Sequence, residues 1–368
     1  QAEDGIRDRR KSLVGSEMCI RDRLSEDEYA VLAPLYGLDR EPNFEGRWHL
    51  HGFRPLQDVA EGLGLPQGQA LALLNRGRDR LLAEREERVR PGRDEKILTA
   101  WNALMIKGMA RAARTLGRRD CLESAERAAE FIRTRMWRDG RLLATCMDGV
   151  AHLNAYLDDY AFLTDALLEL LQTRWRREDL EFAVDLAEAL LSRFLDPKDG
   201  GFFFTSDDHE RLIHRPKPLA DESVPAGNGV AAHALQRLGH LLGDARLIAA
   251  AEGTLTLAAE PMKRMPYAHA SLLAALDEYL HPTEIVVIRG EEDDLAPWRE
   301  AADASYAPRR LTLAIPSGET DLPGTLSAMR PGTRTRAYRC EGTHCGPPVE
   351  DLAEFKRIMG GYRSGHGA

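Results

Sequence analysis

Apolar residues recur at three- and four-residue steps along most of the chain, which is the spacing of one face of an α-helix. The pattern dominates from Arg54 to Leu280 and is clearest in Ile97–Met109, Phe182–Phe194 and Val230–Leu241. An apolar stripe on a helix has to be buried against another element. The pattern therefore predicts a domain of helices packed on one another.

The predicted helices are joined in a repeating way. A helix ends, a short turn follows, and an aspartate stands where the next helix begins, at Asp120, Asp179 and Asp244, about sixty residues apart. An aspartate in that position can accept hydrogen bonds from the unpaired amides of the first helical turn. The repeat predicts stacked αα-hairpins, which form either a solenoid or a closed toroid.

The longer connections between the helix pairs favour the toroid. The segments 137–142 and 196–205 contain Asp-Gly or Gly-Gly followed by apolar or aromatic residues, which predicts inserted β-hairpins. Plain solenoids rarely carry such inserts, whereas a toroid can build the rim of a binding site from them. We therefore predict a mainly α fold, an (α/α) toroid of helical hairpins.

The pattern changes at Thr283, where short apolar runs replace the long helices. Three strands and two helices are expected after this point: 284–288, 311–315 and 335–340 as strands, 293–302 and 352–359 as helices. This arrangement predicts a small βαβ-like region at residues 283–368. Ahead of it, residues 54–282 would form the toroid, and residues 24–53 would connect to it. Residues 1–23 resemble translated sequencing-adapter sequence and are excluded from the fold prediction.

Composition limits the classes of function. The chain of 368 residues is 43% hydrophobic and 30% charged, with a net charge of −9. The acidic balance argues against nucleic-acid binding, and no apolar run has the length of a membrane span. The five cysteines are scattered and do not form a disulfide framework, so a cytoplasmic location is the expectation.

Candidate catalytic and binding residues lie where helices meet loops. The first segment offers Asp94 with Lys96, Trp101 and Asn102, which are an ammonium, a sugar-stacking ring and an amide. As an alternative, Asp94 simply caps a helix.

The second segment offers the adjacent carboxylates Asp158 and Asp159, followed by Tyr160. Two carboxylates at the start of a helix can complement its dipole. If one of them instead faces a central cavity, a paired acid and base would suit glycoside chemistry.

Two further segments contribute Phe203, in a run of three phenylalanines, and Glu222 with Asn228 ahead of a helix. Phe203 should face opposite to its neighbours on a strand. His233 and His269 lie near these segments, and we predict that they could transfer protons or else serve as buried structural histidines. Cys340 and Cys345 could pair or bind a metal. They lack a second ligand pair, so no metal and no cofactor are predicted.

These segments carry a family resemblance. Residues 93–102, 157–162, 200–205 and 225–228, together with Asn43–Gly46 and the stretch from Cys340 to Pro348, resemble motifs of the YyaL-like, spermatogenesis-associated thioredoxin-domain family. The match extends from Leu24 nearly to the C-terminus.

The resemblance implies a thioredoxin-like domain followed by a six-hairpin, glycosidase-like toroid related to sugar epimerases and unsaturated glucuronyl hydrolases. The thioredoxin-like domain is expected to lie outside this sequence, as a partner in cis, with residues 24–38 as its last helix or the connection from it. The family's toroid has no defined reaction to carry over, so the resemblance implies a substrate class alone.

Two hypotheses follow. In the first, the toroid is an enzyme acting on a sugar: Asp94, Asp158, Asp159 and Glu222 supply acid and base, and the rings of Trp101, Tyr160 and Phe203 stack on the ligand, with Lys96, Asn102, Asn228 and His269 binding it. The sequence does not choose between hydrolysis and epimerisation. In the second, the toroid is a non-catalytic ligand-binding module or scaffold for the thioredoxin-like domain.

Overall fold

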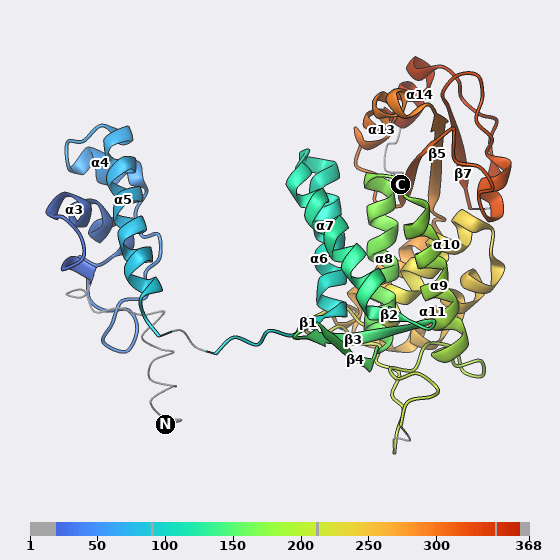
Figure 1. The fold of residues 1–368 in the computed structure, drawn as a ribbon, viewed down its shortest axis with the longest axis horizontal. Coiled ribbons are helices and arrows are strands. Elements are labelled where there is room, and N and C mark those ends of the chain that lie inside the picture. Colours follow the sequence, from blue (N-terminus) through green and yellow to red (C-terminus); the bar gives the residue numbers. More distant parts are fainter. Residues whose placement is uncertain (1–19, 90–91, 211–212, 343, 361–368) are drawn as a thin grey trace. The chain divides into compact units, whose positions relative to one another are not determined.

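A computed structural model describes residues 20–89, 92–210, 213–342 and 344–360 (Figure 1). The chain forms two compact units, Gln1–Asp94 and Glu95–Ala368. The adapter-like segment lies outside the described residues up to position 19. The helices of residues 54–94, which the sequence pattern joined to the toroid, belong to the first unit.

The described part of unit 1 contains helices α3 (Glu26–Tyr36), α4 (Leu56–Gly62) and α5 (Gln67–Glu86). Ser25 caps α3 through a reciprocal pair of hydrogen bonds with Glu28. The apolar faces of the three helices meet in a core of Val31, Leu32, Leu35, Val59, Leu73 and Leu74.

Unit 2 contains helices joined in pairs: α6 (Thr99–Leu116) with α7 (Arg119–Phe131), α8 (Leu157–Thr173) with α9 (Arg177–Arg193), and α10 (Gly227–Leu242) with α11 (Ala245–Arg264). A further helix, α12 (Ala270–Leu280), follows the short 3₁₀ turn η2 (Pro266–Ala268), and a π-helical turn, η1 (Ile132–Met136), ends α7. The first helices of the pairs pack side by side in the order α6, α8, α10 (Figure 1), and α12 packs against α10. Helices α7, α9 and α11 pack outside this row, each against its own partner.

The predicted fold class, an α/α toroid of helical hairpins with a small α/β appendage, is therefore confirmed. Within the described residues of unit 2, the row holds three hairpins and the inner helix α12. None of the described helices has both the length and the apolar character needed to cross a membrane.

The predicted helix caps are confirmed in one case of three. The carboxylate of Asp244 accepts a hydrogen bond from the Arg246 amide at the start of α11. Asp120 instead lies inside the first turn of α7, where its carboxylate pairs with the Arg118 side chain at 2.6 Å. Asp179 lies inside the first turn of α9 and pairs with Arg174. In both exceptions a neighbouring arginine pairs with the carboxylate.

The connections between pairs carry β structure at one end of the helices. Strands β1 (Ile97–Leu98), β2 (Trp137–Arg138) and β4 (Val150–Asn154) all pair antiparallel with β3 (Arg141–Met147). The predicted hairpin at Asp139–Gly140 is confirmed, and both turn residues have positive φ. The Gly-Gly insert forms a single bridge between Leu195 and Phe202 rather than a hairpin of two strands.

The C-terminal appendage has the predicted βαβ unit at its centre. Strands β5 (Glu284–Gly290) and β6 (Arg310–Pro316) are parallel and are linked by η3 (Glu292–Asp294) and α13 (Ala296–Asp303). Strands β7 (Arg336–Glu341) and β8 (His344–Cys345) extend the sheet in the order β6-β5-β7-β8. The 3₁₀ turn η4 (Gly324–Ala328) and helix α14 (Leu352–Gly360) complete the appendage.

The sheet of the appendage packs on both faces. Alternate residues of β5 point to opposite sides, so Ile285 and Val287 join the core of the helix row while Val286 and Ile288 pack against α13 and α14. The appendage therefore shares its core with the helices.

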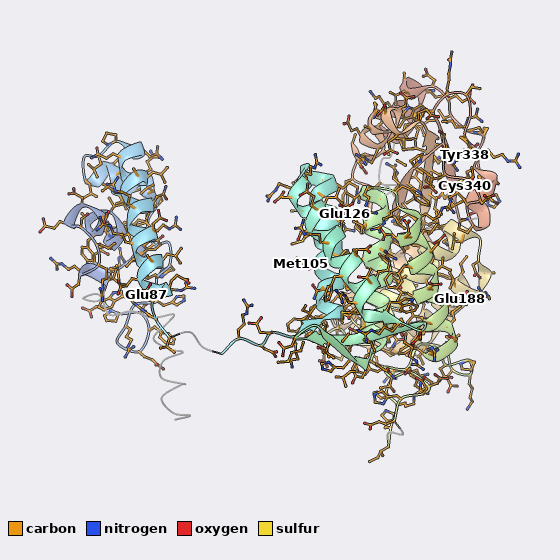
Figure 2. All side chains as sticks on the ribbon, in the orientation of Figure 1. Glu87, Met105, Glu126, Glu188, Tyr338 and Cys340 are labelled. Carbon is orange, nitrogen blue, oxygen red and sulfur yellow. A yellow bond between two sulfur atoms is a disulfide. The ribbon has the colours of Figure 1, made fainter. Side chains whose placement is uncertain are left out.

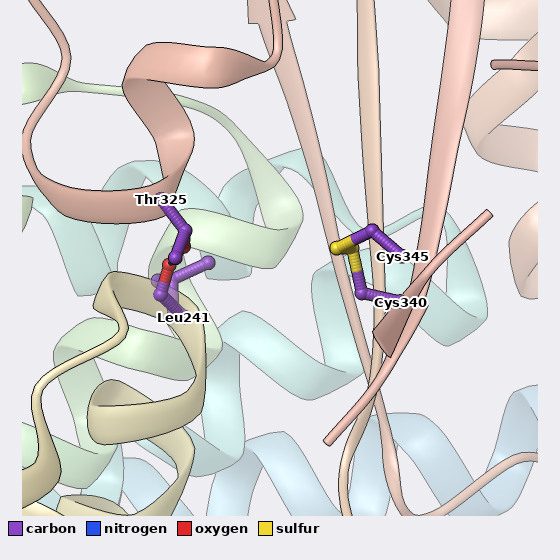
Figure 3. Close-up of a disulfide and its surroundings, with 4 residues drawn as sticks. All are labelled: Leu241, Thr325, Cys340 and Cys345. Atoms are coloured by element: carbon purple, nitrogen blue, oxygen red, sulfur yellow. Dashed lines mark hydrogen bonds between the residues drawn. A yellow bond between two sulfur atoms is a disulfide. The ribbon is translucent and has the colours of Figure 1, made fainter. Parts of the chain in front are cut away.

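Hydrogen bonds attach the appendage to the C-terminal ends of the inner helices. Thr325 donates to the carbonyl of Leu241 at the end of α10, at 2.5 Å (Figure 3). Arg299 donates to the carbonyl of Thr173 at the end of α8, at 2.8 Å. These contacts satisfy carbonyls that a helix end leaves unpaired.

Cys340 and Cys345 form a disulfide between β7 and β8 (Figure 3). Of the two alternatives that the sequence left open, pairing or metal binding, the structure has the pairing. The cytoplasmic location stays a prediction.

Candidate functional site

A cavity of about 440 Å³ lies along the row of inner helices, whose side chains are drawn in Figure 2. Four helices contribute polar or charged side chains to its wall: Lys107, Arg111 and Arg114 from α6, Asp165, Glu169 and Gln172 from α8, His233 and Arg237 from α10, and Ser271 from α12. The appendage contributes another side through residues 302–303, 305–308, 310 and 312. The lining charges recur at steps of three or four residues, which places them on one face of each helix.

His233 is held between two carboxylates in this cavity. Its Nε2 lies 2.9 Å from the Oε2 atom of Glu278 on α12, and its Nδ1 lies 3.6 Å from the Oδ1 atom of Asp165 on α8. The ammonium of Lys107 on α6 pairs with the other oxygen of Asp165. Lys107, Asp165, His233 and Glu278 thus form one series of charged groups in contact, with one group from each of the four inner helices.

Glu278 is the last group of this series and is buried. It accepts hydrogen bonds from Arg237 Nε at 2.7 Å and from Thr283 Oγ1 at 2.6 Å, in addition to its contact with His233. Burial acts to raise the pKa of Glu278, but His233 and Arg237 outweigh it and lower the pKa to about 2. The carboxylate is therefore ionised at neutral pH.

Asp165 is also ionised. Burial opposes the charge, but the attraction of Lys107, together with the contact with His233, holds the pKa of Asp165 well below its usual range. Neither carboxylate beside the imidazole can supply a proton at neutral pH.

A second cluster of ion pairs lies nearer the appendage. Glu169 accepts hydrogen bonds from Arg111 and Arg114, each at 2.7 Å, and Arg114 reaches Asp303 of α13 at 2.8 Å. Burial opposes ionisation of Glu169, but the two arginines lower its pKa. This cluster joins the helix row to the appendage across one end of the cavity.

The predicted residue Asp159 lies at the junction of two helices. Its Oδ1 accepts a hydrogen bond from the Ala100 amide in the first turn of α6, at 2.8 Å, and its Oδ2 accepts one from the Tyr156 amide ahead of α8, at 2.9 Å. Burial raises the pKa of Asp159 to about 7 in spite of these two donors. Asp159 thus ties the start of α8 to the start of α6.

Its neighbour Asp158 contacts a different helix. Asp158 lies against Gly227 at the start of α10, where a Cβ atom would come within 2.2 Å of its Oδ1. Burial raises the pKa of Asp158 to about 6, and the backbone of Gly227 partly offsets this. Asp158 is not among the side chains that line the cavity.

Three other predicted residues are buried in structural contacts. The hydroxyl of Tyr160 accepts a hydrogen bond from the Leu142 amide at 2.9 Å. The side-chain amide of Asn228 pairs with both backbone groups of Phe202, at 2.7 and 3.0 Å. The ring nitrogen Nδ1 of His269, at the start of α12, lies 2.8 Å from the carbonyl of Met265.

The remaining predicted residues lie nearer the surface. Trp101 is 66% exposed, and Asn102 donates to the carbonyl of Leu98 at the start of α6. Phe203 packs under the Arg215 guanidinium at 4.2 Å. Asp94, Lys96 and Glu222 are exposed, and Asp94 is the last residue of unit 1.

Most of the predicted residues of unit 2 thus lie at or near the N-terminal ends of the inner helices, and of all of them His233 alone lines the cavity. Their catalytic and binding roles stay predictions. Of the residues that meet in the cavity, sequence reasoning singled out His233 and did not single out Lys107, Asp165 or Glu278. The available signal was a carboxylate inside an otherwise apolar helix, as with Asp165 and Glu169 in α8.

Among the described residues, no group of three or more His, Cys, Asp or Glu side chains is arranged to hold a metal ion. Each carboxylate beside the imidazole is instead occupied by a cation of the chain itself.

Sequence comparison confirms the resemblance. The chain is homologous to spermatogenesis-associated protein 20 and is 29% identical to the human protein over 323 residues, which are 83% of this chain and 41% of that protein. The chain spans less than half the length of the curated relatives it matches. No family profile matches it.

Among solved structures, the chain is similar to a GH76 α-mannanase from Bacteroides thetaiotaomicron, with 14% identity over 52% of this chain and 54% of that one, at a TM-score of 0.42. It is also similar to cellobiose 2-epimerase from Bacillus thermoamylovorans, with 15% identity over 46% of this chain and 45% of that one, at a TM-score of 0.38. These partial likenesses assign no activity to this chain.

Proposed function

We propose that unit 2 binds a sugar-like ligand in the cavity of the helix row and moves a proton on it, as a sugar epimerase or isomerase does. The observation that carries this proposal is the imidazole of His233, which lies in the cavity with Glu278 against one ring nitrogen. Histidine is the side chain that most often takes and returns protons in enzymes.

The partners of His233 define which nitrogen would act. Glu278 is ionised and accepts a hydrogen bond from Nε2–H, which leaves Nδ1 as the nitrogen that would exchange a proton. Arg237 and Thr283 fix the other side of the Glu278 carboxylate, so the imidazole is held in one orientation. A carboxylate that orients an imidazole in this way is a common arrangement for general bases.

Lys107 supplies a positive charge close to Nδ1. Removing the proton from a carbon beside a carbonyl moves negative charge onto the carbonyl oxygen. A fixed ammonium stabilises such an oxyanion. Lys107 pairs with Asp165, which itself faces Nδ1, so the cation lies near the atom that would take the proton.

The same charges argue against glycoside hydrolysis at this imidazole. Hydrolysis of a glycoside uses one protonated carboxyl group as the general acid. Asp165 and Glu278 are both ionised, because cations lower the pKa of each. Proton transfer by His233 therefore fits the cavity better. The thioredoxin-like partner in cis remains a prediction from the resemblance.

Proton exchange tests the proposal whatever the product of the reaction is. The full chain is incubated in D₂O with D-glucose, D-mannose and N-acetyl-D-glucosamine, and deuterium uptake at the carbon beside the carbonyl is followed by NMR. We expect uptake with at least one sugar and a loss of about 10²-fold or more in His233→Gln. His240→Gln is the matched control, because His240 lies on the same helix and does not line the cavity.

The outcomes separate the two hypotheses. Binding of a sugar without any exchange contradicts catalysis and supports the non-catalytic ligand-binding module. Absence of both exchange and binding refutes the proposed function altogether. Equal loss in His233→Gln and His240→Gln would show that the imidazole has no special part in the reaction.

A further inference from the structure

The appendage contributes an aromatic side chain to the cavity. The loop between α13 and β6 lines the cavity with Ser305, Tyr306, Ala307 and Pro308. Tyr306 is nevertheless 89% exposed, so its ring is open to solvent at the mouth of the cavity.

This loop is fixed along its length. The amide of Arg310 donates to the carbonyl of Ala307 at 3.0 Å, and the guanidinium of Arg310 donates to the carbonyl of Ala302 at 2.8 Å. The hydroxyl of Ser305 donates to the carbonyl of Met359 in α14 at 3.2 Å. Because these bonds hold both sides of Tyr306, little order has to be gained in the loop when a ligand binds.

One contact couples the loop to the proposed catalytic group. Arg237, which is buried, donates to the carbonyl of Pro308 at 2.7 Å and also to the Glu278 carboxylate that faces His233. The same guanidinium thus positions the loop beside Tyr306 and the carboxylate that orients the imidazole. The aromatic ring and the imidazole belong to one rigidly connected wall.

We propose that Tyr306 is the platform on which the sugar ring stacks at the mouth of the cavity, so that the appendage forms part of the ligand-binding site. The C–H groups on one face of a pyranose are apolar and pack against an aromatic face, while the sugar hydroxyls reach the charged groups of the wall. The inference rests on the proposed function and identifies a specificity-determining residue within it.

Binding measurements on the full chain test the role of Tyr306. Dissociation constants for D-glucose, D-mannose and N-acetyl-D-glucosamine are measured by calorimetry for the wild type, Tyr306→Ala and Tyr306→Phe. We expect Tyr306→Ala to weaken binding about 10-fold, the upper end of the effect of one aromatic contact. Tyr306→Phe keeps the ring and should bind within about 2-fold of the wild type. Tyr306 is exposed, so neither substitution removes a buried contact.

Tyr267→Ala is the matched control, because Tyr267 is 81% exposed and does not line the cavity. If the wild type binds a sugar and Tyr306→Ala binds it equally well, the stacking platform is refuted while the proposed function stands. The platform is also refuted if Tyr267→Ala weakens binding as much as Tyr306→Ala does. If the wild type binds none of the three sugars, the proposed function fails and this inference fails with it.

Discussion

Replacing Asp159 by alanine tests whether the paired aspartates serve the fold or the chemistry. In the wild type, the Asp159 carboxylate is the acceptor for two backbone amides, those of Ala100 and Tyr156. Alanine offers no acceptor, and the site is buried, so solvent cannot replace the lost oxygens. Asp159→Ala should therefore lower the free energy of unfolding.

The magnitude follows from these two contacts. Loss of a helix-capping side chain costs about 1 kcal/mol, and a buried amide left without an acceptor costs about 1–3 kcal/mol. Two such amides, shared between the starts of α6 and α8, give an expected loss of ~2–4 kcal/mol. Asp120→Ala is the matched control, because Asp120 also lies in a first helical turn but is exposed. Its pair with Arg118 is exposed to solvent, so its loss should change the free energy of unfolding little.

Urea unfolding of the full chain, followed by circular dichroism, measures both losses. Hydrogen exchange at the first turn of α6 assigns the change to unit 2. If Asp159→Ala is no less stable than Asp120→Ala, or if α6 exchanges at the wild-type rate, then the carboxylate does not join the two helix starts. If Asp159→Ala keeps its stability but loses sugar turnover, the result supports a catalytic role for Asp159.

Three further outcomes are expected. The pKa of Asp158 is raised, so the stability that its protonated carboxyl group contributes is present below pH 3.8 and is lost as the pH rises through about 6. The free energy of unfolding of the wild type should therefore fall between pH 4 and 7, and ~2 kcal/mol of this fall should be absent in Asp158→Asn. The pKa of Glu278 is lowered, so the stability that its carboxylate contributes is present at neutral pH and is lost as the pH falls toward about 2. Glu278→Gln should therefore lower the free energy of unfolding by ~3 kcal/mol in a denaturant titration at pH 7, and the difference should shrink toward pH 2. Gly227→Ala should lower the melting temperature, because its Cβ would meet Asp158, whereas Gly108→Ala on α6 meets no atom within 4 Å and should raise it.

The fold could be predicted from the sequence because its signals are local. Helix periodicity marks the inner and outer helices, and short apolar runs mark the strands of the appendage. As one alternative, the sequence placed one carboxylate of the Asp158–Asp159 pair in a central cavity; the two side chains contact different helices, and neither lines the cavity. The sequence could not predict that Asp120 pairs with Arg118 and does not cap a helix, since the choice between two nearby partners depends on side-chain geometry.

The cavity was harder to predict than the fold. The conspicuous motifs consist of aspartates and glycines, and the structure places those of unit 2 at helix starts, where caps and close approaches require these residue types. The groups that meet in the cavity, such as Lys107, Asp165 and Glu278, are single charged residues within helices. Their convergence depends on which face of each helix turns inward, which is decided by packing between elements far apart in the sequence.

The inner helices are held at both ends, and this explains why their middle can carry charge. At the N-terminal ends, Asp159 joins α8 to α6, and Asp221 accepts hydrogen bonds from the Ser271 amide of α12 and the Ala226 amide ahead of α10, at 2.9 and 2.8 Å. At the C-terminal ends, the appendage donates to the carbonyls of Thr173 and Leu241. Since these bonds and the apolar core fix the row, its inward faces need not supply apolar packing. They can instead present the ion pairs around His233. Replacing such buried pairs by well-packed apolar side chains would leave the stability of the protein unchanged or raise it. Side chains that a fold does not need for its stability are those expected to serve a ligand.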